Sequence, residues 1–188
     1  MPSHGSWSKA AGVTSGLLVV DVQNGVVAGI PGRDELIATI GRLVESARDA
    51  GRLVVWVQHA DEDLVRGSEA WQIVPELPPG DGEPVVEKHH RSAFGDTELG
   101  DLLRGYGIER LVLVGAQSAF CVDMAGKHAL AEGFDVTWVS DGHGNGDQET
   151  TDGIVPDATV RALLNRTWSS LRHPGREVEV VASHDVHW

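Results

Sequence analysis

The chain has 188 residues, of which 41% are hydrophobic and 23% charged, so it can bury one sizeable core and is not an intrinsically disordered chain. Its 28 acidic and 15 basic residues give a formal net charge of −13, which argues against general binding to nucleic acid or anionic membranes because phosphate would be repelled. No apolar run approaches the ~20 residues of a membrane span, and the single cysteine, Cys121, excludes an internal disulfide and a cysteine-rich zinc module.

Residues 1–15 lack the apolar stretch of a signal peptide, and we expect them to form a flexible polar tail before a single domain over residues 16–188. In that domain, six apolar runs predict β-strands. Their near-continuous Val and Leu content is typical of strands that are buried on both faces. The runs cover residues 17–22, 53–59, 84–88, 111–116, 135–141 and 178–183.

Helical patterns separate these strands. Apolar residues recur at helical spacing within 36–47, 97–106 and 122–132, and Pro156 opens a fourth helical pattern that continues to Leu171. The alternation predicts an α/β fold: a parallel, six-stranded, doubly wound sheet with helices on both faces, in three α/β/α layers.

Two stretches are expected to be long loops, 60–83 and 142–155, and long loops in a compact domain are often functional. The glycines at 142, 144 and 146 do not have the G-x-G-x-x-G spacing of a nucleotide-binding turn. A lid or a subunit contact is the better interpretation of that loop. Its acidic side chains either attract a basic substrate amine or form a solvated surface.

Three chemically useful side chains lie at predicted strand ends. Asp21 ends the first apolar run, Lys88 ends the third, and Cys121 follows the fourth by a short turn. Each also has an ordinary structural interpretation: a turn-closing Asp, a surface Lys, and a small buried hydrophobe. Because parallel strands end at one edge of a sheet, we expect all three to meet there, where open α/β sheets place their sites.

This combination has a mechanism. A helix is expected to begin near Cys121 or Val122, and its dipole would lower the pKa of the thiol from its usual value of ~8.5. A carboxylate can accept the thiol proton, an ammonium can stabilise the thiolate, and the thiolate can attack a carbonyl to give an acyl-enzyme. Backbone N–H groups of the turn at 117–121 could bind the oxyanion.

The segments LLVVDVQNG, EKHHRSAFGDTEL and LVLVGAQSAFCVDMAGKHALAEGFDVTWVSDG, in this order, resemble the isochorismatase-like cysteine hydrolase superfamily over about residues 16–141. The resemblance implies a catalytic triad of Asp21, Lys88 and Cys121. It also implies a non-proline cis peptide bond before Gln117, with the N–H groups of Gln117 and Cys121 as the oxyanion hole. Because Cys121 is present, the amidohydrolase branch fits best.

The sequence departs from the family pattern at two places. Metal-binding members carry Asp-x-His after the second strand, whereas this chain has Gln58-His59-Ala60-Asp61, so we expect no cofactor and no metal. His59 and Asp61 are the first candidates if one binds, with His89, His90 and His143 as further ones. The first motif continues Asn24-Gly25-Val26-Val27 instead of with an acidic residue and Phe, which leaves the substrate class open.

Substrate-binding candidates are His59, Gln23, Trp71, Phe94 and Phe120. Gln23 either contacts the ligand or holds the Asp21 loop, and the three aromatic residues are candidate pocket walls that could equally belong to the core.

The leading hypothesis is a cysteine hydrolase that cleaves a C–N bond of a small molecule, and the acidic charge favours a cationic or cyclic amide, as in the streptothricin hydrolase branch. The alternatives are a catalytically silent binding or scaffold protein of the same fold and a flavodoxin-like nucleotide or flavin binder. We expect a small-molecule substrate as the partner, with neither nucleic acid nor membrane. The single cysteine fits a reducing cytoplasm. The resemblance implies a homodimer or homotetramer.

Overall fold

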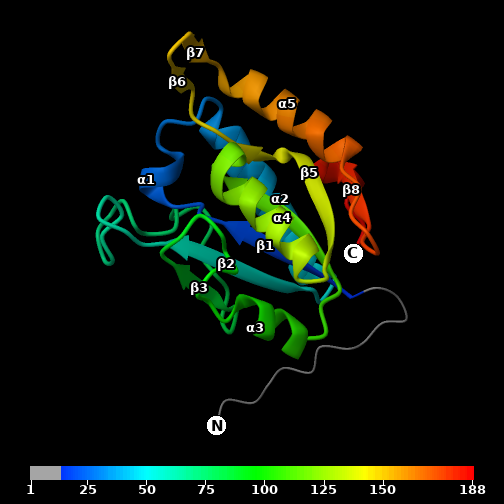
Figure 1. Ribbon diagram of the computed structural model, residues 1–188. Coiled ribbons are helices and arrows are strands. Elements are labelled where there is room, and N and C mark those ends of the chain that lie inside the picture. The colour runs from blue at the N-terminus through cyan, green and yellow to red at the C-terminus, as the bar shows by residue number, and fades with distance from the viewer. Residues whose placement is uncertain (1–13) are drawn as a thin grey trace.

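The computed structural model describes residues 14–188, which form one six-stranded parallel sheet with a separate hairpin. The sheet order is β3-β2-β1-β4-β5-β8 (Figure 1). Its strands are β1 (Ser15–Val20), β2 (Leu53–His59), β3 (Val85–Lys88), β4 (Arg110–Ala116), β5 (Asp135–Gly144) and β8 (Val178–Val181). The strand order reverses between β1 and β4, and such a reversal opens a crevice at the carboxyl ends of the strands.

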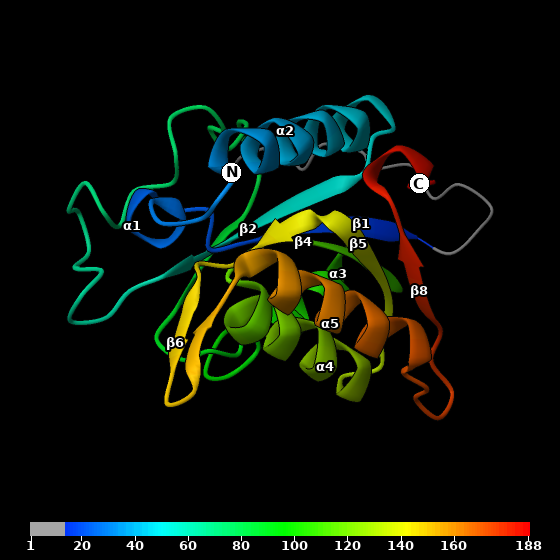
Figure 2. The same ribbon diagram turned by 90° about the horizontal axis from the view of Figure 1, so that it is seen from above.

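Helices cover both faces of the sheet (Figure 2). On one face lie the short α1 (Asn24–Val27) and the long α2 (Arg33–Asp49). On the other lie α3 (Leu99–Gly105), α4 (Asp123–Ala131) and α5 (Asp157–Ser170). Each face has its own apolar core, because the central strands alternate their buried side chains between the two layers. The predicted three-layer α/β fold is therefore confirmed.

Close packing at the carboxyl end of β4 requires a glycine. Gly115 has φ +131°, and a Cβ on it would lie 2.0 Å from the backbone oxygen of Val20. The backbones of β1 and β4 can therefore approach only because Gly115 has no side chain. This approach brings the end of β1 beside the turn that follows β4.

The structure corrects one loop and one boundary. The segment 60–83 has no helix or strand, as expected, but 142–155 is not a plain loop: β5 continues to Gly144, and β6 (Gln148–Thr150) pairs with β7 (Gly153–Val155) as a hairpin. Residues 142–144 extend β5 because His143 and Gly144 pair with β4 again after an irregularity in the register. Ser15, which was expected in the tail of residues 1–15, belongs to β1. Residues 1–13 lie outside the described part of the chain, so the tail stays a prediction.

Some of the acidic residues near the hairpin form hydrogen bonds within the protein. Asp157 is buried, accepts hydrogen bonds from the Asn145 backbone and the Arg161 guanidinium, and donates its own N–H to Asp147. Asp141 accepts from the backbone and hydroxyl of Ser183. These three carboxylates therefore stabilise the fold here. Within residues 14–188, no helix is long and apolar enough to cross a membrane.

Candidate active site

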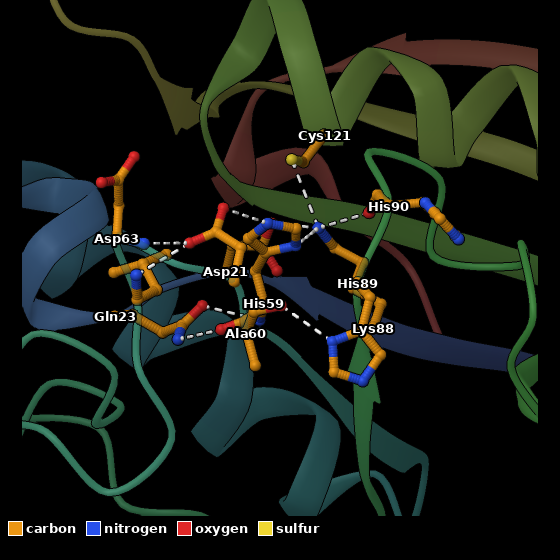
Figure 3. A network of polar contacts seen from close by, with 11 residues as sticks. Asp21, Gln23, His59, Ala60, Asp63, Lys88, His89, His90 and Cys121 are labelled. Atoms are coloured by element: carbon orange, nitrogen blue, oxygen red, sulfur yellow. Dashed lines mark hydrogen bonds and ion pairs between the residues drawn. The ribbon is translucent and has the colours of Figure 1, made fainter.

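The site lies at the carboxyl edge of the sheet, where residues from three strand ends converge (Figure 3). Asp21 directly follows β1 and Lys88 is the last residue of β3. Cys121 lies in the single-turn π-helix η1 (Ser118–Val122), which runs into α4. Asp21 has φ +50°, and its backbone N–H donates to the carbonyl of Val57 on β2. The three side chains that the sequence singled out therefore lie together at the strand-order reversal.

Lys88 is the centre of the contacts. Its Nζ lies 2.7 Å from Asp21 Oδ2, and both side chains are almost wholly buried. The same Nζ donates to the His90 carbonyl at 3.1 Å, to His59 Nδ1 at 3.1 Å and to Cys121 Sγ at 3.3 Å. Buried charges are costly unless paired and hydrogen-bonded, and this ammonium meets both conditions.

The electrostatics around Cys121 differ from the expectation. Burial, followed by the negative charge of Asp21, raises the pKa of the Cys121 thiol to about 12, although Lys88 acts in the opposite direction. Burial also raises the pKa of Asp21, and its ion pair with Lys88 partly offsets that rise. The predicted lowering of the thiol pKa by a helix dipole is therefore wrong. Helical structure begins at Ser118, so Cys121 is not at the tip of the helix.

The turn before Cys121 is compact. The Ala116–Gln117 peptide bond is cis, as the resemblance implied. The Gln117 carbonyl accepts hydrogen bonds from the N–H groups of Phe120 and Val122. The role of the Gln117 and Cys121 N–H groups as an oxyanion hole stays a prediction.

The amide of Gln23 holds the chain around the site. Gln23 is fully buried and donates to the carbonyls of His59 and Trp71, while its Oε1 accepts from the His59 N–H. All three contacts are to the protein backbone. Of the two roles considered for Gln23, the structure therefore favours holding the loop over contacting a ligand.

The expected pocket-wall residues differ in their surroundings. Phe94 is half-buried and packs against His128 and Phe134 at the margin of the core, and its role as a pocket wall stays a prediction. Phe120 is half-buried, and the Arg91 guanidinium lies 4.6 Å from the centre of its ring. Trp71 is half-buried, and its Nε1 is buried without a hydrogen-bond partner among the described residues. Trp71 and Phe120 thus stay candidates for substrate contact.

The possible metal ligands do not gather. His59 Nε2 lies 2.9 Å from Asp61 Oδ2, but the side chains of His89 and His90 are mostly exposed, with surface partners. His143 is buried and hydrogen-bonded to Ser118. Across residues 14–188, no three His, Cys, Asp or Glu side chains are grouped as metal ligands would be.

Sequence reasoning missed two groups at the site. The His90 carbonyl, which binds Lys88, is a backbone atom and leaves no signal in the sequence. Arg91 lies three residues after Lys88 in the same loop, and that proximity could have indicated a basic group at the edge of the site.

The amino-acid sequence matches the Isochorismatase domain family over residues 15–156, which includes every residue of this site. The chain belongs to the isochorismatase family. A streptothricin hydrolase from Streptomyces noursei is 35% identical over 173 residues, which are 88% of this chain and 67% of that protein. The ureidoacrylate amidohydrolase RutB from Klebsiella pneumoniae is 29% identical over 162 residues, with 64% of this chain and 67% of that protein covered.

A solved isochorismatase structure from Pseudomonas putida superposes on this isochorismatase-family chain with a TM-score of 0.84. The two are 26% identical, and the match covers 93% of this chain and 91% of the other. The family assignment thus rests on both sequence and fold, and the named relatives include hydrolases and an amidohydrolase.

Proposed function

We propose that this isochorismatase-family chain is a cysteine amidohydrolase that cleaves a C–N bond of a small molecule through a thioester intermediate. The observation that carries the proposal is the position of Lys88 Nζ, which contacts both the Asp21 carboxylate and the Cys121 sulfur. That contact joins a base, a cation and a nucleophile in one cluster, in which Asp21 and Lys88 are buried and Cys121 is half-buried.

In the first half-reaction, Asp21 accepts the Cys121 proton as sulfur attacks the carbonyl carbon of the amide. Because the thiol pKa is about 12, proton transfer and attack occur together instead of from a preformed thiolate. Lys88 stabilises the charge on sulfur as it develops. The N–H groups of Gln117 and Cys121 bind the oxyanion of the tetrahedral intermediate, and each such donor is worth about 10²–10³ in rate.

The intermediate collapses when Asp21 returns the proton to the amide nitrogen. The C–N bond breaks, the amine leaves, and a thioester remains on Cys121. In the second half-reaction, Asp21 takes a proton from water, whose oxygen attacks the thioester carbonyl. The C–S bond breaks, the carboxylic acid leaves, and the proton restores the thiol, so that one water is consumed for each amide.

For the substrate, we propose a cationic or cyclic amide. The 35% identity to a streptothricin hydrolase and the net charge of −13 support this choice. Trp71 Nε1 supports a contact with substrate, since a buried N–H without a partner costs about 1–3 kcal/mol and a bound acceptor would remove that cost.

The test is turnover of a panel of small amides, with cationic and neutral members of equal size, by wild type, Cys121→Ala and Cys121→Ser. We expect turnover by wild type alone, with higher kcat/KM for the cationic members. Mass spectrometry of the acid-quenched enzyme should find the acyl group on Cys121. Turnover by Cys121→Ala at the wild-type rate would refute the proposal.

The second candidate is a catalytically silent binding protein of the same fold. The observation that favours it is the raised pKa of Cys121, since a proton held this tightly makes an isolated thiol unreactive. The two candidates differ in one measurement. A silent binder retains an amide in equilibrium dialysis without forming an acyl adduct, whereas the hydrolase releases a carboxylic acid and an amine.

We further propose a small molecule as the only ligand class, a cytoplasmic location, and self-association as a homodimer or homotetramer. The single cysteine supports the location. Two exposed apolar side chains, Ile154 on β7 of the hairpin and Leu163 on α5, support self-association. Light scattering over a concentration series tests it, and a monomer at every concentration would remove that part of the proposal.

A further inference from the structure

A second polar network lies behind the Cys121 turn, and the proposed mechanism does not use it. Ser118, in η1, is fully buried, and its Oγ lies 2.8 Å from Nδ1 of the buried His143 on β5. His143 Nε2 lies 2.9 Å from Oδ1 of Asn165 on α5. Trp138 Nε1 donates to the same Oδ1 at 2.8 Å. The network therefore joins the turn to β5 and α5.

Both ring nitrogens of His143 have hydrogen-bond partners. Asn165 Nδ2 donates to the Ser140 carbonyl, so Oδ1 is the atom that faces the imidazole. His143 Nε2 has two neighbours of opposite kind, the acceptor Asn165 Oδ1 at 2.9 Å and the donor Trp138 Nε1 at 3.0 Å, so either neutral tautomer of the ring finds a partner there. The Ser118 hydroxyl can donate to a bare Nδ1 or accept from a protonated one, so the contact to His143 exists in either tautomer. Burial lowers the pKa of His143 to about 4, which keeps the ring neutral at physiological pH.

A second contact ties the same turn to the same segment. The Ala119 N–H donates to Asn145 Oδ1 at 3.1 Å, and Asn145 is fully buried. The backbone of Asn145 is held in turn by the Asp157 carboxylate at 2.9 Å. Two successive residues of the turn are thus bound from 143–145, on β5 and the residue after it, and Cys121 follows two residues later.

Ser118 cannot be a second nucleophile toward a substrate, because it is fully buried. Its hydroxyl serves to fix the turn. The Lys88 ammonium contacts Cys121 Sγ. The distance between the two groups depends on where the turn is held.

We propose that Ser118 and His143 are positioning residues for the nucleophile, and that their hydrogen bond holds the 117–121 turn so that Cys121 Sγ stays within reach of Lys88 Nζ. The consequence for catalysis rests on the proposed amidohydrolase function, but the positioning itself does not. It assigns a role to the start of the 142–155 segment: this segment supports the nucleophile from behind.

The experiment uses a matched pair at one position. In His143→Asn the amide occupies the place of Nδ1 and keeps an acceptor for Ser118. In His143→Gln it occupies the place of Nε2 and keeps the contact to Asn165. Both variants remove the ring that packs 4.5 Å from Trp138, so both lose similar packing. A second pair, Ser118→Ala and Ser118→Thr, removes or keeps the hydroxyl without changing the ring. Arg172→Ala, in a distant surface cavity, is the control.

The primary measurement is the rate of Cys121 alkylation by iodoacetamide in the native state, which needs no substrate, alongside the urea midpoint of each variant. We expect His143→Gln and Ser118→Ala to react about five- to tenfold more slowly than wild type, because each variant loses one hydrogen bond that positions Cys121. His143→Asn, Ser118→Thr and Arg172→Ala should remain within about twofold of wild type.

Equal alkylation rates in all variants would overturn the proposal, as would losses that follow the urea midpoint and not the presence of the Ser118 contact. If the His143 variants fail to fold, the Ser118 pair alone decides. With an active amide in hand, positioning predicts a lower kcat with an unchanged KM. An inactive amide panel together with the alkylation pattern above would refute the amidohydrolase function and leave the positioning role standing.

Discussion

Lys88 has three N–H bonds and four acceptors within reach. The Asp21 carboxylate and the His90 carbonyl each take one, and the third is shared between His59 Nδ1 and Cys121 Sγ. His59 is in turn held by Asp61 through its other ring nitrogen. A hydrogen bond to a charged acceptor is stronger than one to a neutral acceptor. As negative charge develops on sulfur, the shared N–H should therefore shift from His59 to Cys121.

The pH dependence of Cys121 reactivity is a direct test of its surroundings. Because the thiol pKa is raised to about 12, the thiolate fraction grows about tenfold per pH unit below that value. We expect the rate of alkylation by iodoacetamide to rise through the whole range from about pH 7 to pH 10. A rate that levels off below pH 8 would contradict this, since it would indicate an ordinary or lowered thiol pKa.

The Asp21–Lys88 pair is also a structural element of the buried site. Lys88→Met leaves the Asp21 carboxylate buried without its cation, and we expect unfolding in urea to show a loss of about 3–5 kcal/mol at pH 7. The double variant Asp21→Asn, Lys88→Met carries no buried charge and should recover much of that loss. A Lys88→Met variant within 1 kcal/mol of wild type would show that the pair contributes little.

The elements β1 and β4 depend on one glycine for their contact. A Cβ at Gly115 would collide with the Val20 backbone, and the positive φ disfavours any side chain. We expect Gly115→Ala to cost about 3 kcal/mol or more in urea unfolding, since two backbones would have to separate.

Gly105 is the matched control for that substitution. It is the last residue of α3, and a Cβ there meets nothing within 4 Å. Gly105→Ala should leave stability unchanged or raise it by about 0.5–1 kcal/mol, because alanine favours the helix. Equal effects at the two positions would contradict the packing argument.

The whole molecule carries a net charge of −13, which opposes its own folding by mutual repulsion. Its surface ion pairs are each worth about 0–1 kcal/mol, so we expect the repulsion to outweigh them. Salt shortens the range of the interaction to about 10 Å at 0.1 M. We therefore expect Tm, followed by circular dichroism, to rise between low salt and 0.15 M sodium chloride. A Tm that falls would mean that the ion pairs dominate.

Periodicity was enough to predict all six strands of the sheet and its principal helices, because a strand buried on both faces needs a continuous apolar run and a covering helix needs an apolar stripe. Periodicity did not predict the strand at residues 142–144. There β5 continues through Gly142, His143 and Gly144, whose sequence has the composition of a loop. The strand continues because β4 offers a partner for it, and a single sequence does not reveal such a partner.

For the candidate site too, the sequence predicted some features and only the tertiary structure determined the others. Asp21, Lys88 and Cys121 were identifiable from the chain alone, because strand ends of a parallel sheet share an edge and those side-chain types suit one chemistry. The ionisation of Cys121, the use of Gln23 by the backbone and the bond between Ser118 and His143 were decided only by the tertiary structure. Each depends on burial and on neighbours between 25 and 100 residues away. Chemical type and local pattern are properties of the chain, whereas solvent exclusion and hydrogen-bond partners arise only when distant segments pack together.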